Sequence, residues 1–328
     1  MKFLNYENPV WDGYCADPFV LRAGEFYYCY ATASNGGTHD LGGRHFVLLR
    51  SGNLVNWEFL GGALQPAQGL EHASHWAPEV AFSGGRYWMY YSANNGAGGD
   101  DTTHRLRVAV ADAPEGPFQD CGLLLFPDEG FTIDPSPFCD PQSGKWYLYI
   151  AKDYLENFVG TGTAVAPLAD DMKTILAPPV PVVVASADWQ VYERNRTHYG
   201  QLWETWHTVE GAHVVFREGK YWCFFAAGNW QNQTYGVGCA VAPHPLGPWK
   251  VPTEGASVLR GNAEVIGPGH NSVVLGPDDQ THICVYHAWN AEGSQRQLCI
   301  DPIEWTPDGP RVSPTRTGGV LPLQAKSE

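Results

Sequence analysis

Residues 76–90, WAPEVAFSGGRYWMY, carry the pattern that decides the fold: a residue able to do acid–base or ion chemistry, a short strand, a glycine turn and an aromatic-rich strand. The same order recurs at residues 16–30, 133–150, 209–226 and 269–286. The second strands are centred on Tyr28, Trp88, Tyr147, Trp222 and Ile283, at intervals of 60, 59, 75 and 61 residues. A period of this length that carries strands, without sustained helical periodicity, is typical of a β-propeller.

The repeats predict an all-β chain. Each unit reads as an inner strand and an aromatic second strand, and segments such as residues 106–118, LRVAVADAPEGPF, continue into a hairpin of third and fourth strands. Five units therefore predict a five-bladed β-propeller with four antiparallel strands per blade, in which the aromatic strands pack between blades. Because no Ser/Pro-rich linker interrupts the repeats, we expect residues 1–328 to form a single domain.

The 75-residue interval contains an insertion near residues 180–207 that is rich in Trp and Tyr. A loop of this length over one face of a propeller can narrow the end of its axial channel. We expect the segment from Asp188 to Trp206, with Trp189 and Trp203, to do so. The alternative is that these Trp side chains pack on the outside of the fourth blade.

The composition excludes several classes of partner. The formal net charge of −15 disfavours nucleic acid and anionic polysaccharides, whereas a neutral sugar is compatible with it. No run of 18 apolar residues could span a membrane. The eight Cys show no metal-ligand spacing, and the first residues show no secretory signal, so we expect a cytoplasmic protein with reduced thiols.

Three carboxylates share nearly the same place in their repeats. Asp17, Asp134 and Glu210 precede the centres of their second strands by 11, 13 and 12 residues. In a propeller the inner strands line the axis, so this placement brings all three into one pocket. A pair of carboxyl groups in different protonation states can cleave a glycosidic bond, and a third carboxylate can raise a neighbour's pKa.

Other acidic residues occur as doublets in loops that contain Gly or Pro. We expect their side chains to be solvated surface rather than part of the pocket; they are Asp100, Asp101, Asp170, Asp171, Asp278 and Asp279.

The phrases that open the five repeats resemble glycoside hydrolase family 43: ADPFV at Asp17, WAPEV at Trp76–Val80, IDPSPF at Asp134, VEGAHVV at Glu210 and GPGHNSV at His270. The resemblance covers essentially the whole chain and implies a five-bladed propeller that inverts the anomeric centre. It implies that Asp17 is the general base, Glu210 the general acid, and Asp134 the carboxylate that tunes and orients the acid. One departure is that Ala212 stands where the family usually has Pro after Glu-Gly.

Three further residues are candidates for binding. Trp76 can stack on a sugar ring or pack between blades. Arg296 can face the carboxylates and a sugar hydroxyl or form a surface ion pair. His270 opens the fifth repeat, and the resemblance implies an axial position from which it can contact a bound water, a calcium or another ion; the alternative is a structural role, which we also favour for His287. His270 is the one protein ligand visible in the sequence, whereas calcium prefers six to eight oxygen ligands, so a calcium ion here would need mostly water.

From these residues we expect an inverting, exo-acting α-L-arabinofuranosidase that acts on arabino- or arabinoxylo-oligosaccharides and requires no cofactor. A β-D-xylosidase, or an enzyme with both activities, is the first alternative. A non-catalytic sugar-binding propeller would have lost at least one of the three carboxylates. A phosphorolytic enzyme would need a cluster of cations for phosphate, and Arg296 is the only candidate cation in the axial phrases. Linkage and oligomeric state stay open.

Overall fold

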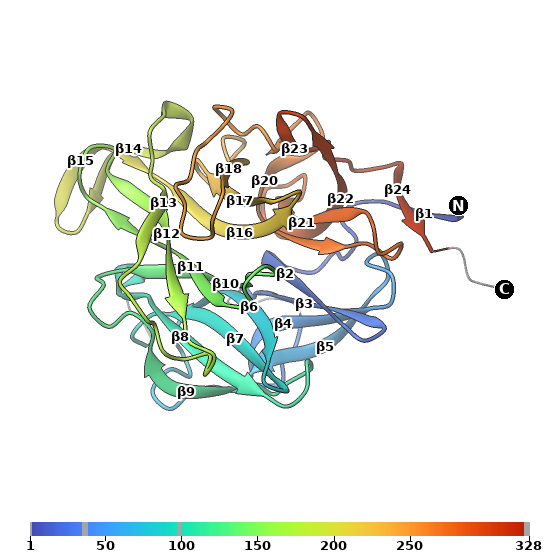
Figure 1. The fold of residues 1–328 in the computed structure, drawn as a ribbon, viewed down its shortest axis with the longest axis horizontal. Helices are drawn as coiled ribbons and strands as arrows, with labels where there is room; N and C mark the ends of the chain where they lie inside the picture. Colours follow the sequence, from blue (N-terminus) through green and yellow to red (C-terminus); the bar gives the residue numbers. More distant parts are fainter. Residues whose placement is uncertain (1, 35–38, 97–99, 325–328) are drawn as a thin grey trace.

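The computed structural model describes residues 2–34, 39–96 and 100–324, and its sheets are arranged as a five-bladed β-propeller (Figure 1). The first blade is built from β2 (Ala16–Ala23), β3 (Phe26–Thr32), β4 (His45–Ser51) and β5 (Trp57–Leu64). The second consists of β6 (His75–Ser83), β7 (Arg86–Ala93), β8 (Arg105–Ala111) and β9 (Gln119–Leu124). The predicted fold class is confirmed.

The third sheet is larger than predicted. It contains β10 (Thr132–Cys139), β11 (Trp146–Tyr154), β12 (Gly160–Leu168) and β13 (Val180–Val183), and it adds a hairpin of β14 (Val191–His198) and β15 (Gln201–His207). The insertion near residues 180–207 forms this hairpin, which meets β12 through a parallel pairing of Gly160 with His207.

The remaining two blades again have four strands each. The fourth contains β16 (Val209–Arg217), β17 (Lys220–Ala227), β18 (Gly236–Ala242) and β19 (Leu259–Arg260). The fifth contains β20 (Ile266–Leu275), β21 (His282–Trp289), β22 (Arg296–Thr306) and β23 (Gly309–Val312). The described helices are two short 3₁₀ helices, η1 (Asp101–Thr103) and η2 (Asp188–Gln190), and no described helix has the length and apolarity to cross a membrane.

The core lies between the blades, as the aromatic strands predict. Five clusters of buried side chains each combine residues from two neighbouring blades, for example Tyr30 of β3 with Tyr91 of β7, and Tyr149 of β11 with Phe225 of β17. Burying aromatic rings of this size is worth roughly 1.5–3 kcal/mol per side chain. The packed interfaces therefore hold the five inner strands at fixed positions around the axis.

Every inner strand contains the same irregularity near its start. In each, the pairing with the second strand skips two residues, and the first of the two has a positive φ: Asp17 (51°), Ala77 (48°), Asp134 (54°), Gly211 (58°) and His270 (46°). A bulge of this kind re-aims a side chain, and a non-glycine residue in this region is strained. Asp17, Asp134 and His270 are therefore exact structural equivalents, whereas Glu210 lies one position earlier, like Trp76.

The two ends of the chain are joined at one carboxylate. β1 (Lys2–Tyr6) pairs with β24 (Gly319–Leu323), next to the fifth blade (Figure 1). The buried Asp301 of β22 accepts hydrogen bonds from the hydroxyls of Tyr6 and Tyr286, from the side-chain amide of Asn8, and from both the backbone N–H and the hydroxyl of Thr315. Asp301 thus links the N-terminal strand, the fifth blade and the C-terminal segment.

We expect Asp301→Ala to lower the free energy of unfolding by about 3–5 kcal/mol, because it leaves several buried donors without an acceptor. The midpoint of thermal unfolding measures the effect, with the exposed Asp308→Ala as the matched control. An unchanged midpoint in the Asp301 variant would contradict the role of this carboxylate in closing the propeller.

Candidate active site

A cavity of about 350 Å³ opens at one end of the axis and receives side chains from all five blades. All six residues predicted to act or bind lie in its wall, together with four others. The wall is formed by Asp17, Ser74, Trp76, Asp101, Ile133, Asp134, Glu210, Trp230, His270 and Arg296. The structure therefore brings the predicted site residues together in one pocket.

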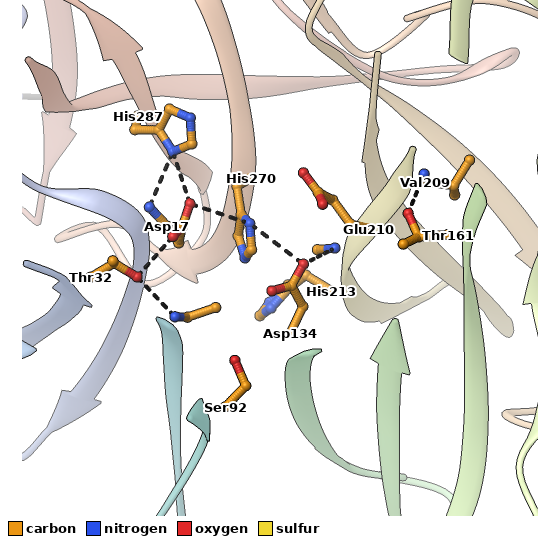
Figure 2. A network of polar contacts seen from close by, with 12 residues as sticks. Asp17, Thr32, Ser92, Asp134, Thr161, Val209, Glu210, His213, His270 and His287 are labelled. Carbon is orange, nitrogen blue, oxygen red and sulfur yellow. Dashed lines mark hydrogen bonds and ion pairs between the residues drawn. The ribbon is translucent and has the colours of Figure 1, made fainter. Parts of the chain in front are cut away.

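Asp17 is held as a carboxylate by the groups around it. Its Oδ2 accepts a hydrogen bond of 2.8 Å from the hydroxyl of Thr32 (Figure 2). Its Oδ1 lies 3.2 Å from a guanidinium nitrogen of Arg296. Burial on its own raises the pKa of Asp17, but the charge of Arg296, the electrostatic interactions with His270 and His287 and the Thr32 hydrogen bond together outweigh it, and the pKa falls to about 2. Asp17 is consequently ionised at neutral pH and can accept a proton.

Two histidines face Asp17, and both are neutral. The backbone N–H of Asp17 donates to Nδ1 of His287 at 3.1 Å, so this nitrogen carries no proton. Burial, reinforced by Arg296, lowers the pKa of His287 well below its usual value, and burial also lowers the pKa of His270. Nδ1 of His270 lies 3.5 Å from Oδ1 of Asp17 and 3.9 Å from Oδ2 of Asp134. Among the causes that lower the pKa of Asp17, the charge of Arg296 is therefore the largest.

Glu210 has the opposite electrostatic environment. Burial raises the pKa of its carboxyl group to about 7; the hydrogen bond from Tyr235 lowers it, and the negative charge of Asp17 raises it. The Tyr235 hydroxyl donates to Oε1 of Glu210 at 2.7 Å. Near neutral pH a large share of Glu210 therefore retains its proton and can donate it.

Asp134 is tied to the strand that carries Glu210. Its Oδ2 accepts a hydrogen bond of 3.1 Å from the backbone N–H of Gly211, the residue after Glu210 (Figure 2). Burial, and next the charge of Glu210, raise the pKa of Asp134 well above its usual value. A Cβ on Gly211 would lie 3.2 Å from the His270 ring, at a φ of +58° that favours glycine. Because Gly211 has no side chain, β16, which carries Glu210, can approach both Asp134 and His270.

Of the three carboxyl groups at the starts of the inner strands, one is thus ionised and two have a raised proton affinity. A carboxylate that accepts a proton from water, facing a carboxylic acid that donates to a leaving oxygen, is the equipment of an inverting glycosidase. The sequence also matches the family description "Glycosyl hydrolases family 43" over residues 6–310. The chain belongs to this family. It is accordingly a glycosidase that acts on carbohydrate substrates.

Several members of family 43 are similar over most of the chain. A crystal structure described as a thermostable family-43 glycoside hydrolase has a TM-score of 0.82 and 30% identity, covering 98% of this chain and 100% of that one. The beta-D-galactofuranosidase xynD of Aspergillus niger is 27% identical over 342 residues, which cover 98% of this chain and 86% of the relative. Xylosidase/arabinosidase 43B of Humicola insolens is 25% identical over 302 residues, and the match spans 89% of this chain and 51% of that protein.

The other predicted binding residues of this family 43 site are also fixed by their neighbours. The Trp76 ring is stacked on the imidazole of the buried His104, with centroids 3.6 Å apart, and Trp76 also lines the pocket. Arg296 is not a surface ion pair: besides Asp17 it contacts the hydroxyl of Tyr14 at 2.8 Å and lies over the Trp230 ring at 4.5 Å. Both residues are therefore placed to contact a sugar.

Several residues of the site were missed or misjudged from the sequence, with Ser74, Ile133 and Trp230 of the pocket wall among them. Thr32, Tyr235 and His287 orient the carboxylates, but none stands in a distinctive motif: Thr32 ends β3, His287 lies within β21, and Tyr235 directly precedes β18. Asp101 was expected on the solvated surface; its side chain is exposed, but it also lines the pocket. Its membership of a doublet gave no indication of this second position.

The predicted cap over the pocket is not formed by the Trp-rich insertion. Trp189 packs against Phe225 in the core, and Trp203 and Trp206 pack on each other, with ring centroids 5.8 Å apart. Within the described ranges, none of the ten residues in the pocket wall comes from residues 180–207. β14 and β15 pair with each other, and the Trp203 and Trp206 rings of this hairpin pack on each other rather than over the pocket.

Glu79 and His213 also act on His270 through their charges, and Oε1 of Glu79 lies 3.5 Å from Nδ1 of His213. The parts of the chain that the structure describes hold no group of three or more His, Cys, Asp or Glu side chains suited to a metal. Calcium prefers six to eight oxygen ligands, and His270 supplies none. The residues present do not fit calcium, and no catalytic step is assigned to an ion at His270.

Proposed function

We propose that this family 43 chain is an inverting, exo-acting α-L-arabinofuranosidase of arabino- or arabinoxylo-oligosaccharides. The observation that carries the mechanism is the contrast between Asp17, with a pKa of about 2, and Glu210, with a pKa of about 7, in one pocket. Asp17 accepts a proton from the attacking water while Glu210 protonates the glycosidic oxygen. The water attacks from the face opposite the leaving group, which inverts the anomeric carbon.

Asp134 acts through Glu210 in this mechanism. Its hydrogen bond to the Gly211 N–H fixes the strand on which the acid stands, and it competes with Glu210 for protons. Arg296 keeps Asp17 ionised and presents further N–H groups to the pocket. These roles need no cofactor. The eight unpaired cysteines are in keeping with a cytoplasmic location, which we include in the proposal.

A furanoside substrate is supported by the relative named as a beta-D-galactofuranosidase, since β-D-galactofuranose and α-L-arabinofuranose share the same ring configuration. The relative named as a xylosidase/arabinosidase supports β-D-xylosidase activity as the second candidate. Initial rates on aryl α-L-arabinofuranoside, aryl β-D-galactofuranoside and aryl β-D-xyloside distinguish the three. A fastest rate on the xyloside would replace the proposed substrate with the second candidate.

Two product measurements test the mode of action. Proton NMR of the first sugar released should show the inverted anomer, and a retained anomer would reject the roles given to Asp17 and Glu210. Early products from a linear arabino-oligosaccharide should be monosaccharide and the shortened chain. Intermediate oligomers at the first turnovers would indicate internal cleavage.

The hydrogen bond from Tyr235 to Glu210 leads to a prediction on pH dependence. The bond stabilises the ionised form of Glu210, so it lowers the pKa of the acid. Tyr235→Phe should raise that pKa, keep the proton on Glu210 to higher pH, and move the alkaline limb of the kcat/KM profile upward from about pH 7. Tyr149→Phe, which loses a buried hydroxyl outside the pocket, is the control. A limb that stays in place would exclude Tyr235 as a partner of the acid.

A further inference from the structure

Trp230 is a fixed part of the pocket wall that the hydrolytic mechanism does not use. Its indole is stacked on Trp289, with centroids 6.0 Å apart and planes at 14°, and the guanidinium of Arg296 lies 4.5 Å from its ring centre. Nε1 of Trp289 also donates a hydrogen bond of 2.7 Å to the backbone carbonyl of Trp230. Because these contacts already fix the Trp230 side chain, binding a ligand against its ring costs no further side-chain entropy.

Its place in the fourth blade puts Trp230 on the solvent side of the acid. Glu210 pairs with Ala226 at the end of β17, and Trp230 stands in the loop that continues outward from that strand. The inner end of the pocket is occupied by Asp134 and His270, so a sugar bound for cleavage must have its leaving group toward the mouth. Trp230 therefore lies where the group protonated by Glu210 departs.

Asp101 reaches the same mouth from the second blade, on the other flank of the third blade. The backbone carbonyl of Asp101 accepts from the N–H of His104 at 3.2 Å, and His104 supports Trp76, so the position of η1 is fixed. The side chain is exposed, and over the described residues no hydrogen bond or ion pair occupies its carboxylate. An exposed carboxylate on a fixed backbone can accept hydrogen bonds from two vicinal hydroxyls.

We propose that Trp230 and Asp101 form the binding subsite for the first sugar of the leaving group. The indole stacks on the apolar face of that ring, and the Asp101 carboxylate accepts from its hydroxyls. The chemistry selects a neutral sugar ring, because a uronic acid in this position would place its charge near Asp101. The inference rests on the hydrolysis proposed above. It specifies the sugar that the enzyme binds on the leaving-group side of the cleaved bond.

The test compares two substrates that share the cleaved sugar. One is the disaccharide, chosen from the arabino-, galactofurano- and xylo-series as the one that the wild-type enzyme cleaves fastest; the other is the glycosyl fluoride of the same sugar, which has nothing in the leaving-group subsite. Trp230→Ala should lower kcat/KM on the disaccharide about tenfold more than on the fluoride, mainly through KM. Asp101→Asn should show a difference of about threefold to tenfold. Trp203→Ala and Asp170→Asn, which alter the same residue types outside the pocket wall, are the matched controls.

Equal losses on the two substrates would overturn the subsite, because Trp230 would then act only by holding Arg296. Calorimetric titration of the Asp17→Asn protein gives a readout that does not depend on turnover. The disaccharide should bind more tightly than the monosaccharide, and adding Trp230→Ala should remove the difference. Equal binding of the two sugars would reject the subsite even if hydrolysis proceeds as proposed, whereas a wild-type enzyme that cleaves none of the three series would reject the proposed function alone.

Discussion

Replacing Asp17 by Asn should lower kcat on oligosaccharides by about 10³–10⁴ while the protein stays folded. Asn has the same shape and can still accept from Thr32, and the bond between the Asp17 backbone and His287 does not involve the side chain. What is lost is the charge that accepts the proton of the attacking water, and loss of a general base typically costs about 10²–10⁴ in rate. We expect the upper end because, within the pocket wall, Arg296 makes Asp17 the carboxylate with the lowered pKa.

Two further measurements separate this effect from general damage. Azide, which needs no deprotonation, should restore turnover in the variant and give a glycosyl azide of inverted configuration. Because Asp17 raises the pKa of Glu210 and Arg296 lowers it, removing the Asp17 charge should also move the alkaline limb of the residual activity to lower pH. Asp170→Asn on the surface should retain full activity. Near wild-type rates for Asp17→Asn on natural oligosaccharides would remove Asp17 from the base position.

The positions of the main side chains could be predicted because a repeat fixes them. Asp17, Asp134 and His270 stand at the same bulge of their inner strands, so counting from the aromatic strands placed them at the axis. The count did not show that Glu210 differs from them: its distance of 12 residues lies between the 11 of Asp17 and the 13 of Asp134, yet Glu210 precedes the bulge that Gly211 occupies. Hairpin length differs between blades, and only the pairing of the strands reveals which residues correspond.

The sequence could not predict residues whose role depends on loops. Tyr235 reaches Glu210, and Trp230 reaches Arg296, from the connection between β17 and β18, which has no repeating pattern. For the Trp-rich insertion, the aromatic content predicted a functional role that the structure does not show. We expected a cap over the pocket, but Trp203 and Trp206 pack on each other within the β14–β15 hairpin. In both cases the contact partner decides the role, and residue type alone does not identify it.

The second large effect should follow from replacing Glu210 by Gln, and its size should depend on the leaving group. Gln can still accept the hydrogen bond from Tyr235, so the side chain keeps its place. It has no acidic proton, and an oligosaccharide, whose departing alkoxide is strongly basic, should lose about 10²–10⁴ in kcat/KM.

A 2,4-dinitrophenyl glycoside or a glycosyl fluoride leaves without protonation, so the Glu210→Gln enzyme should hydrolyse either at a rate within about tenfold of the wild type. The alkaline limb near pH 7 should disappear with these substrates, because the group that loses its proton there is Glu210, with its raised pKa of about 7. The acidic limb belongs to Asp17 and should persist. A uniform loss on good and poor leaving groups would mean that Glu210 binds the sugar rather than donating the proton, and Asp134, whose pKa is also raised, would then be the candidate acid.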